Sequence, residues 1–447
     1  MRNTGRWRVL ALCGAWACGQ DGPAGNDAVP DLPVVDAGAP QGSGIAPEAG
    51  RDGGTMPVLR DGGVTVSTPT PIDASTALAT TDAAGGDTAD AATVGEASRY
   101  VLDCGDAGIA LESAGPPKNR VNYAIVGDGY TEADLGSTYL AHLKEMLRVR
   151  FLPESEVYLR YRKFVNICAL KTPSPRSGIG ETRGDSAFGG YGNDASRLGY
   201  VQDSKVTAAI ARLLPKEIEV DWIAVVLNGN RWWNAGGQLM VWSGGHKDAG
   251  LAAMHEGGHS FFLLADEYGG NCTFNGRETE MRINVTRDGT GTAGKWSKWL
   301  DFTHAPGTGK QGIIEGAEYC DKGAYRPSQD SVMNSLWRSS YLNAISREQA
   351  VRVIYGMVQP IDDATPADTT APGVFFVRVV DPKVIDVAWH IDGAEAPVAK
   401  GERLDVAALG LPKGKHSLRA RASDNTPWVR GDRTKLEQTK SWSVDVP

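Results

Sequence analysis

The sequence predicts an α/β domain followed by a small all-β domain. Short apolar segments alternate with segments of helical periodicity between residues 121 and 243, which is typical of an α/β sheet. Beyond residue 372, apolar residues alternate with polar or small ones in several short runs, which is the pattern of half-buried strands. Pro, Thr and Asp dominate residues 362–372 and indicate a linker between the two domains.

The first 18 residues have the features of an export signal. Arg2, Arg6 and Arg8 precede an apolar core that ends at Ala17 and is too short to span a bilayer. Small residues directly before Cys18 resemble a bacterial lipobox, so we expect Cys18 to be lipidated and to attach the protein to a membrane. An ordinary signal peptide with an incidental cysteine is the alternative. Either reading predicts an exported protein, as an outer-membrane or cell-surface lipoprotein or in secreted form.

Residues 19–98 form a predicted disordered acidic linker. This segment has no aromatic residue and carries twelve Asp and Glu residues against Arg51 and Arg60. It cannot bury enough apolar surface to offset the entropy lost on ordering. The rest of the chain is close to neutral and shows no basic cluster, so a nucleic-acid partner is not expected.

The α/β domain is expected to span residues 99–360. Its predicted elements are, in order, a strand at 121–126, a helix at 132–149, a strand at 164–170, a helix at 204–214, strands at 222–227 and 237–243, and a closing helix at 346–355 with Ser346 as N-cap. The continuous apolar run at 222–227 indicates a strand buried on both faces.

The strand at 237–243 is expected to border a cleft and to offer a free edge to an extended substrate, unless it is an ordinary edge strand. The preceding loop, 228–237, contains Arg231, Trp232 and Trp233. This loop is expected to contact substrate at the rim of the cleft, with packing of its two tryptophans in the core as the alternative.

A metal-binding motif lies at residues 254–268. His255 and His259 are four residues apart, so on a helix their imidazoles project from one face and can share a metal ion. Neutral imidazole suits Zn²⁺, and the carboxylate of Glu256 can take a proton from metal-bound water. A helix beginning near Asp248 is too apolar for a solvated surface helix, which argues against a chance match.

Two histidines leave zinc without a third protein ligand. Asp266, eleven residues after His255, is the nearest carboxylate beyond the expected helix end, and Glu267 is its competitor. Gly257 and Gly258 oppose the helix by about 1 kcal/mol each relative to Ala. Close backbone packing around a metal site is one reason for their presence.

The motif resembles the active-site signature of the bacterial IgA peptidase family of zinc metallopeptidases. The resembling residues are His255-Glu256-x-Gly258-His259-Ser260-Phe261 and Leu264-Ala265-Asp266-Glu267-Tyr268, with further segments at 126–130, 325–328, 331–334 and 343–348. The resemblance covers roughly residues 120–358. Cleavage of immunoglobulin A is a property of particular members and is not carried over to this chain.

Members of this family look like metzincins, in which a Met-turn lies beneath the metal. The resemblance therefore implies a zincin-like catalytic domain with one zinc ion, ligands His255, His259 and Asp266, catalytic Glu256, and Met333 in the Met-turn. One departure is that Phe262 and Leu263 stand where the family usually has a glycine after the second histidine.

Two tyrosines flank the Met-turn candidate. A hydroxyl near the metal can stabilise the oxyanion of a tetrahedral intermediate, so Tyr325 and Tyr341 are candidates for that role, with buried structural tyrosines as the alternative. For the cysteines we expect the pairs Cys104–Cys168 and Cys272–Cys320 in an exported protein. Four cysteines allow three pairings, so the sequence alone leaves the choice open.

These features together predict a zinc endopeptidase that hydrolyses extracellular proteins or peptides. Residues 373–447 form a predicted Ig-like β-sandwich that positions substrate, binds a partner or acts as a spacer. Two rival functions share parts of this pattern. They are a surface adhesin on an inactive peptidase scaffold, which would not need Glu256, and a zinc amidase acting on cell-wall peptides.

Overall fold

The computed structural model describes residues 100–290, 295–335 and 340–447. The chain divides into Met1–Ala97 and Ser98–Pro447, and all the described residues belong to the second unit. The predicted signal peptide, the lipidation of Cys18 and the acidic linker lie outside the described residues. No described helix is long and apolar enough to cross a membrane.

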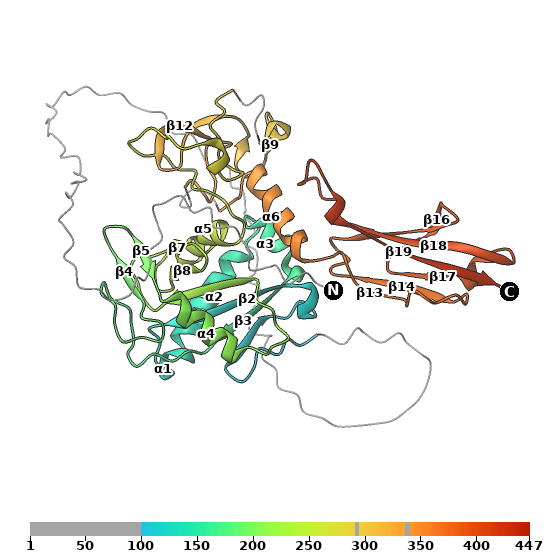
Figure 1. Ribbon diagram of the computed structural model, residues 1–447, viewed down its shortest axis with the longest axis horizontal. Helices are drawn as coiled ribbons and strands as arrows, with labels where there is room; N and C mark the ends of the chain where they lie inside the picture. Colours follow the sequence, from blue (N-terminus) through green and yellow to red (C-terminus); the bar gives the residue numbers. More distant parts are fainter. Residues whose placement is uncertain (1–99, 291–294, 336–339) are drawn as a thin grey trace, which may run out of the picture. The chain divides into compact units, whose positions relative to one another are not determined.

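A central sheet that includes β2, β3, β7 and β8 forms the middle of the α/β region (Figure 1). It has six strands in the order β1-β3-β2-β6-β8-β7. The four inner strands are parallel, whereas β1 and β7 pair antiparallel at the two edges. The strands are β1 (Gly108–Glu112), β2 (Val121–Asp128), β3 (Val165–Leu170), β6 (Trp222–Leu227), β7 (Ala235–Gly236) and β8 (Met240–Ser243). The α/β class predicted from the alternating pattern is therefore confirmed.

Successive side chains of the inner strands pack alternately into two apolar cores, one on each face of the sheet. Tyr123 and Ile125 of β2 pack with helices α2 (Thr138–Arg150), α5 (Ala249–Ser260) and α6 (Ala344–Met357). Ala124 and Val126 face the other way and pack with α4 (Asp203–Leu213). The remaining short elements of this region are α1 (Glu132–Leu135), α3 (Glu156–Arg160) and a hairpin of β4 (Tyr191–Asn193) and β5 (Leu198–Tyr200).

Three predicted elements differ from the structure. The single helix expected at 132–149 is divided, because α1 ends at Leu135 and α2 begins at Thr138. The strand expected at 237–243 is only β8, and its supposed free edge is occupied because β7 folds back and pairs with it. The closing helix begins earlier than predicted, at Ala344, and its N-cap is Asn343, whose side chain accepts a hydrogen bond from the Ser346 amide.

Between α5 and α6, the described residues form only short elements. Two hairpins are formed by β9 (Thr303–His304) with β10 (Gly309–Lys310) and by β11 (Ile314–Ala317) with β12 (Cys320–Arg326). A disulfide joins Cys272 to Cys320. A separate small core includes Ala265, Val285 and Ala324.

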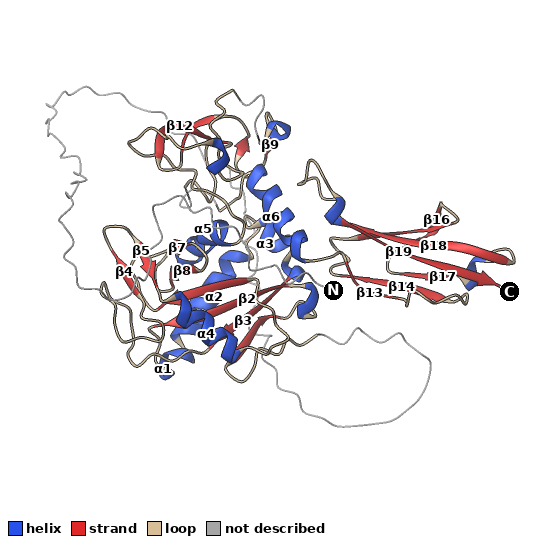
Figure 2. Cartoon of the chain, in the orientation of Figure 1, coloured by secondary structure: helices blue, strands red, loops and turns tan. Residues whose placement is uncertain are grey.

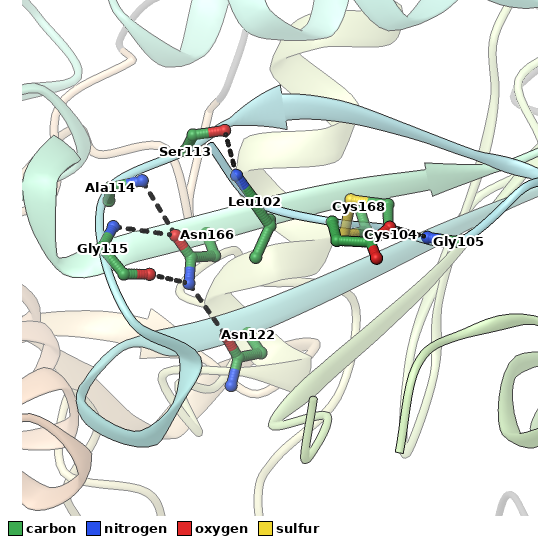
Figure 3. The surroundings of a disulfide bond; sticks show 10 residues. Leu102, Cys104, Gly105, Ser113, Ala114, Gly115, Asn122, Asn166 and Cys168 are labelled. Carbon is green, nitrogen blue, oxygen red and sulfur yellow. Dashed lines mark hydrogen bonds between the residues drawn. A yellow bond between two sulfur atoms is a disulfide. The ribbon is translucent and has the colours of Figure 1, made fainter. Parts of the chain in front are cut away.

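A second disulfide ties the start of the described chain to the central sheet. Cys104 is bonded to Cys168 of β3 (Figure 3). Both expected cysteine pairs are therefore present. Close by, the buried side chain of Asn166 accepts a hydrogen bond from the Ala114 amide (2.8 Å) and donates one to the Gly115 carbonyl (2.9 Å). Together these bonds fix the strand β1 and the turn that follows it against β3.

The C-terminal strands form two antiparallel sheets (Figure 2). One has the order β13-β14-β17 and the other the order β16-β15-β18-β19. The bounds are β13 (Ile361–Ala364), β14 (Val374–Val379), β15 (Asp386–Ile391), β16 (Ala394–Lys400), β17 (Arg403–Asp405), β18 (Gly414–Ser423) and β19 (Glu437–Val446). Residues 361–364 thus form a strand, although the composition of this stretch indicated a linker beginning at 362.

Aromatic residues link the two C-terminal sheets, and a buried carboxylate links them to the helices. The ring of Trp442 lies 5.4 Å from Phe375 and 5.8 Å from Trp389. Asp424, directly after β18, accepts hydrogen bonds from the hydroxyls of Tyr161 (2.7 Å) and Tyr355 (3.0 Å). The C-terminal strands are therefore fastened to the α/β region by a buried polar network.

Candidate metal centre

Helix α5 brings His255, Glu256 and His259 together. Their potential ligand atoms all lie within 4.8 Å of one another. The two imidazole rings are perpendicular, with centroids 4.7 Å apart, and their Nε2 atoms are separated by 3.1 Å. The spacing of four residues therefore places both rings on one face of the helix, as the sequence predicted.

Two backbone carbonyls determine which nitrogen of each ring carries the proton. His255 Nδ1 lies 2.8 Å from the carbonyl oxygen of Val332, and His259 Nδ1 lies 2.9 Å from that of Leu264. A carbonyl oxygen can only accept a hydrogen bond, so both Nδ1 atoms are the donors. Each neutral ring then presents an unprotonated Nε2, which is the arrangement that metal-binding histidines require.

Asp266 supplies a third atom at the same point. Its Oδ1 lies 3.1 Å from His255 Nε2 and 3.2 Å from His259 Nε2. Apart from these two nitrogens, no hydrogen-bond donor reaches this buried oxygen from the part of the chain that the structure describes. Ligands of a tetrahedral zinc ion, each about 2.0–2.1 Å from the metal, lie about 3.3 Å apart. The three atoms therefore fit a zinc ion in both chemical type and spacing.

The two carboxylates of this cluster favour a positive charge at the point where the histidine nitrogens meet. Burial by itself lowers the pKa of His259, but Asp266 and Glu256 outweigh it and raise the value to about 9. For Asp266, burial by itself raises the pKa, but the two histidines outweigh this effect and hold the pKa well below its ordinary value. Three converging lone pairs repel one another unless a proton or a metal ion lies between them, and a bound metal ion would displace protons from these atoms.

Glu256 lies beside these three atoms and has a different environment. Burial raises the pKa of its carboxyl group, against the opposing effect of both histidines. The edge strand β7 passes directly over it, since a Cβ atom added to Gly236 would lie 2.9 Å from Glu256 Oε2 and 2.6 Å from His259 Cβ. The glycine thus lets a sheet edge approach this carboxylate closely.

Glu267, the competing third ligand, points to a different set of partners. Its carboxylate accepts hydrogen bonds from Asn284 Nδ2 (2.8 Å), Asn343 Nδ2 (2.7 Å) and Ser331 Oγ (2.5 Å), and the residue is fully buried. Its backbone amide also donates to the carbonyl of Met333 at 2.8 Å. Of the two adjacent carboxylates, only Asp266 reaches the histidines.

Comparison with known proteins places this geometry in a family. Residues 109–308 match the family model described as IgA Peptidase M64. This segment belongs to the M64 peptidase family. The protein is therefore a peptidase, a hydrolase of peptide bonds, and M64 peptidases are metallopeptidases. The matched segment contains α5 and Asp266 but ends before Met333. No curated protein matches the chain significantly.

The turn from the M64 helix to Asp266 is made without the glycine that the family resemblance implied. Helix α5 ends at Ser260, six residues before Asp266. Leu263 then takes a left-handed conformation with φ of 58°, and the Leu264 amide donates to the Gly258 carbonyl at 2.9 Å. Left-handed backbone costs a non-glycine residue about 1–2 kcal/mol, so the surrounding packing maintains this turn.

The two glycines of the peptidase helix allow close packing on both sides. A Cβ atom at Gly258 would lie 2.4 Å from Met333 Sδ, and one at Gly257 would lie 2.9 Å from the ring of Trp222. Met333 is fully buried. The close approach that the sequence offered as a reason for these glycines is thus present, and Met333 packs against the helix turn that carries His259.

The tyrosine that contacts the metal centre of this peptidase is not one that the sequence singled out. Tyr325 lies in β12 opposite Glu315, and the ring of Tyr341 packs edge-on against His304 at 5.6 Å. Tyr319 instead donates a hydrogen bond from its hydroxyl to Asp266 Oδ2. The ring of Tyr268, inside the motif, stacks near His255 at 6.5 Å. Only Tyr268 had a signal in the sequence, namely its place in the family motif.

The loop before β7 has a mixed character. Trp233 is buried, and its ring nitrogen donates to Asp194 at 2.7 Å, so this tryptophan belongs to the core. Trp232 is partly buried, with its ring 4.9 Å from that of His246. Arg231 is exposed and pairs with Asp194. Of the three residues predicted at the rim, Trp233 is a packing residue.

Proposed function

We propose that this protein is a zinc-dependent endopeptidase whose metal is held by His255, His259 and Asp266. The observation that carries the proposal is the convergence of the two Nε2 atoms and one carboxylate oxygen, 3.1–3.2 Å apart, with no donor other than the histidines for that oxygen within the described residues. Imidazole and carboxylate are ligands typical of a catalytic zinc site with three protein ligands. The packing of Met333 against Gly258 supports the metzincin-like arrangement.

The residues around the proposed zinc site have different roles in hydrolysis. A bound zinc ion would act as a Lewis acid, polarising the scissile carbonyl and acidifying water. Glu256 accepts the proton of the attacking water and then passes it to the leaving amine. Burial raises the pKa of this carboxyl group, which makes it a stronger base than an exposed glutamate. The Val332 and Leu264 carbonyls keep both imidazoles in the tautomer that binds metal.

We also propose that the enzyme is exported and acts on extracellular proteins or peptides. The support is the signal-like segment 1–18 together with two disulfides, which form and persist in oxidising compartments. Lipidation of Cys18 would attach it to a membrane through the acidic segment 19–98. The C-terminal sheets would form the predicted sandwich, with the peptidase domain ending near β13.

The test compares the full chain with its Glu256→Ala variant. We expect both proteins to bind one zinc ion per chain, measured by inductively coupled plasma mass spectrometry, and only the parent to cleave a mixed pool of extracellular proteins. Zinc binding by both proteins without cleavage by either would favour an amidase acting on non-protein substrates or a binding role. Failure of the parent to bind zinc would refute the proposed function.

A further inference from the structure

The turn between β11 and β12 has an unusual backbone for its sequence. Ala317 pairs with Cys320, so Glu318 and Tyr319 form a two-residue hairpin loop. Their φ angles are 52° and 62°, both in the left-handed region. Hairpin loops of this kind normally use Asn-Gly or similar pairs, because side chains disfavour this conformation. A glutamate and a tyrosine at these positions therefore indicate that other contacts hold the turn in place.

Those contacts come from the end of the metal-binding motif and the residues directly after it. The Glu318 amide donates to the Asp266 carbonyl and the Tyr319 amide to the Tyr268 carbonyl, each at 3.1 Å. The neighbouring residue Cys320 is bonded to Cys272, and the Asp321 amide donates to the Gly270 carbonyl at 2.7 Å. Main-chain bonds and a covalent link thus hold the hairpin turn against residues 266–272.

The side chain of Tyr319 then completes the surroundings of Asp266. Its hydroxyl donates to Asp266 Oδ2, while Oδ1 of the same carboxylate faces the two histidines. The tyrosine ring packs edge-on against Tyr268 at 5.1 Å, although the residue as a whole is 55% exposed. The two oxygens of Asp266 therefore have separate partners, a hydroxyl on one side and the histidine nitrogens on the other.

We propose that Tyr319 is a positioning residue for Asp266, and that the Cys272–Cys320 disulfide holds the turn that presents it. A hydrogen bond to one oxygen of a ligating carboxylate fixes its rotation and keeps the other oxygen directed at the metal. Without the hydroxyl, Asp266 can rotate and meet the histidines in several orientations. This proposal rests on the proposed function, because it takes Asp266 as a metal ligand.

The experiment measures zinc binding by the full chain and its Tyr319→Phe variant, using competition with a chromophoric chelator. Loss of a partner that orients a ligand typically weakens metal affinity about 10- to 100-fold, and we expect the zinc dissociation constant to rise by that factor. The visible absorption spectrum of the Co²⁺-loaded variant should also change, because its intensity reports ligand geometry. The ring of Tyr319 is retained, so the hydrophobic contact with Tyr268 persists.

A matched control separates positioning from general stability. Tyr139→Phe removes a hydroxyl that donates to the Ile125 carbonyl at 3.2 Å in the core of the sheet. This variant should unfold at lower urea concentration yet bind zinc like the parent. The double variant Cys272→Ser/Cys320→Ser should weaken zinc binding in the same direction as Tyr319→Phe. Adding Tyr319→Phe to it should then have a smaller effect than in the parent, because both changes act through one turn.

The outcomes distinguish this proposal from the proposed function. Unchanged zinc affinity and an unchanged Co²⁺ spectrum in Tyr319→Phe, with normal binding by the parent, would overturn the positioning role alone. Equal losses of affinity in Tyr319→Phe and Tyr139→Phe would likewise overturn it, since the effect would then reflect stability. Failure of the parent to bind zinc, or binding that survives His255→Ala, would overturn the assignment of the metal ligands themselves.

Discussion

The assignment of Asp266 rather than Glu267 as third ligand predicts opposite behaviour for two adjacent variants. Asp266→Asn removes the anionic oxygen that faces both histidines, so zinc affinity should fall by at least about 100-fold, more than the loss of a residue that only orients a ligand. Glu267→Gln should keep zinc bound, because its carboxylate contacts only amide and hydroxyl donors.

The loss of stability expected for Glu267→Gln follows from the hydrogen bonds that its carboxylate accepts. Three short hydrogen bonds reach the carboxylate, from Asn284, Ser331 and Asn343, and the Ser346 hydroxyl adds a long one at 3.5 Å. Hydrogen bonds to a charged group contribute about 1.5–3 kcal/mol and those to a neutral group about 0.5–1.5 kcal/mol, so each bond weakens by about 1 kcal/mol. A buried amide loses less hydration than a carboxylate, and we expect a net fall of about 2 kcal/mol in the free energy of unfolding.

The assay has two readouts on each variant. Zinc per chain and the zinc dissociation constant report the metal site, and urea unfolding in the presence of a chelator, followed by tryptophan fluorescence, reports stability without metal. The reasoning is refuted if Glu267→Gln folds normally but loses zinc, or if Asp266→Asn retains the affinity of the parent. Either result would exchange the roles of the two carboxylates.

Three further predictions concern packing, strain and charge. Gly258→Ala should lower the urea midpoint of unfolding, because crowding against Met333 costs about 1–3 kcal/mol, whereas the higher helix propensity of alanine stabilises the helix by only about 1 kcal/mol. A raised midpoint would show that Met333 moves aside freely. Glu318→Asn should raise the free energy of unfolding by about 1 kcal/mol, since asparagine tolerates a φ of 52° better than glutamate does. An unchanged free energy of unfolding in the urea titration would show that the turn is unstrained. Burial by itself raises the pKa of Glu156, but hydrogen bonds from His304 and Arg347 lower the pKa overall. Glu156→Gln should therefore have a smaller free energy of unfolding than the parent at pH 7. This difference should vanish as the pH falls below about 4, where the carboxylate of the parent becomes protonated. Urea unfolding from pH 3 to 7 measures it, and a difference independent of pH would contradict the ionic contribution.

The sequence alone predicted what depends on local spacing. His255, Glu256 and His259 share a face because they lie on one helix, and the strand at 222–227 is buried on both faces because its apolar run is continuous. The closing helix was also predicted, but not its N-cap. Ser346 and Asn343 are both good N-cap residues, and the choice of Asn343 depends on its contact with Glu267, which is distant in sequence.

Features that depend on the tertiary structure could not be predicted in this way. Tyr319 meets Asp266 across 53 residues, and nothing near it in the sequence marks it as different from Tyr325. The pairing of β7 with β8 rests on two residues, Ala235 and Gly236, too few to show strand periodicity. The left-handed turn at Leu263 contradicts local preference altogether, because a leucine gives no sign of a positive φ.

The position of that turn explains why two adjacent carboxylates have different roles. Leu263 reverses the chain after α5, so that the Leu264 carbonyl orients His259 and the next residues run back past the helix. Asp266 then faces the histidines, whereas Glu267 faces Asn343 and the segment of Met333. A deletion of one residue between Leu263 and Asp266 would bring Glu267 to the place of Asp266, and an insertion of one residue would bring Ala265 there, which has no ligand atom in its side chain. The length of this segment is therefore as important to the site as the identity of its ligands, and the strain at Leu263 is the cost of maintaining it.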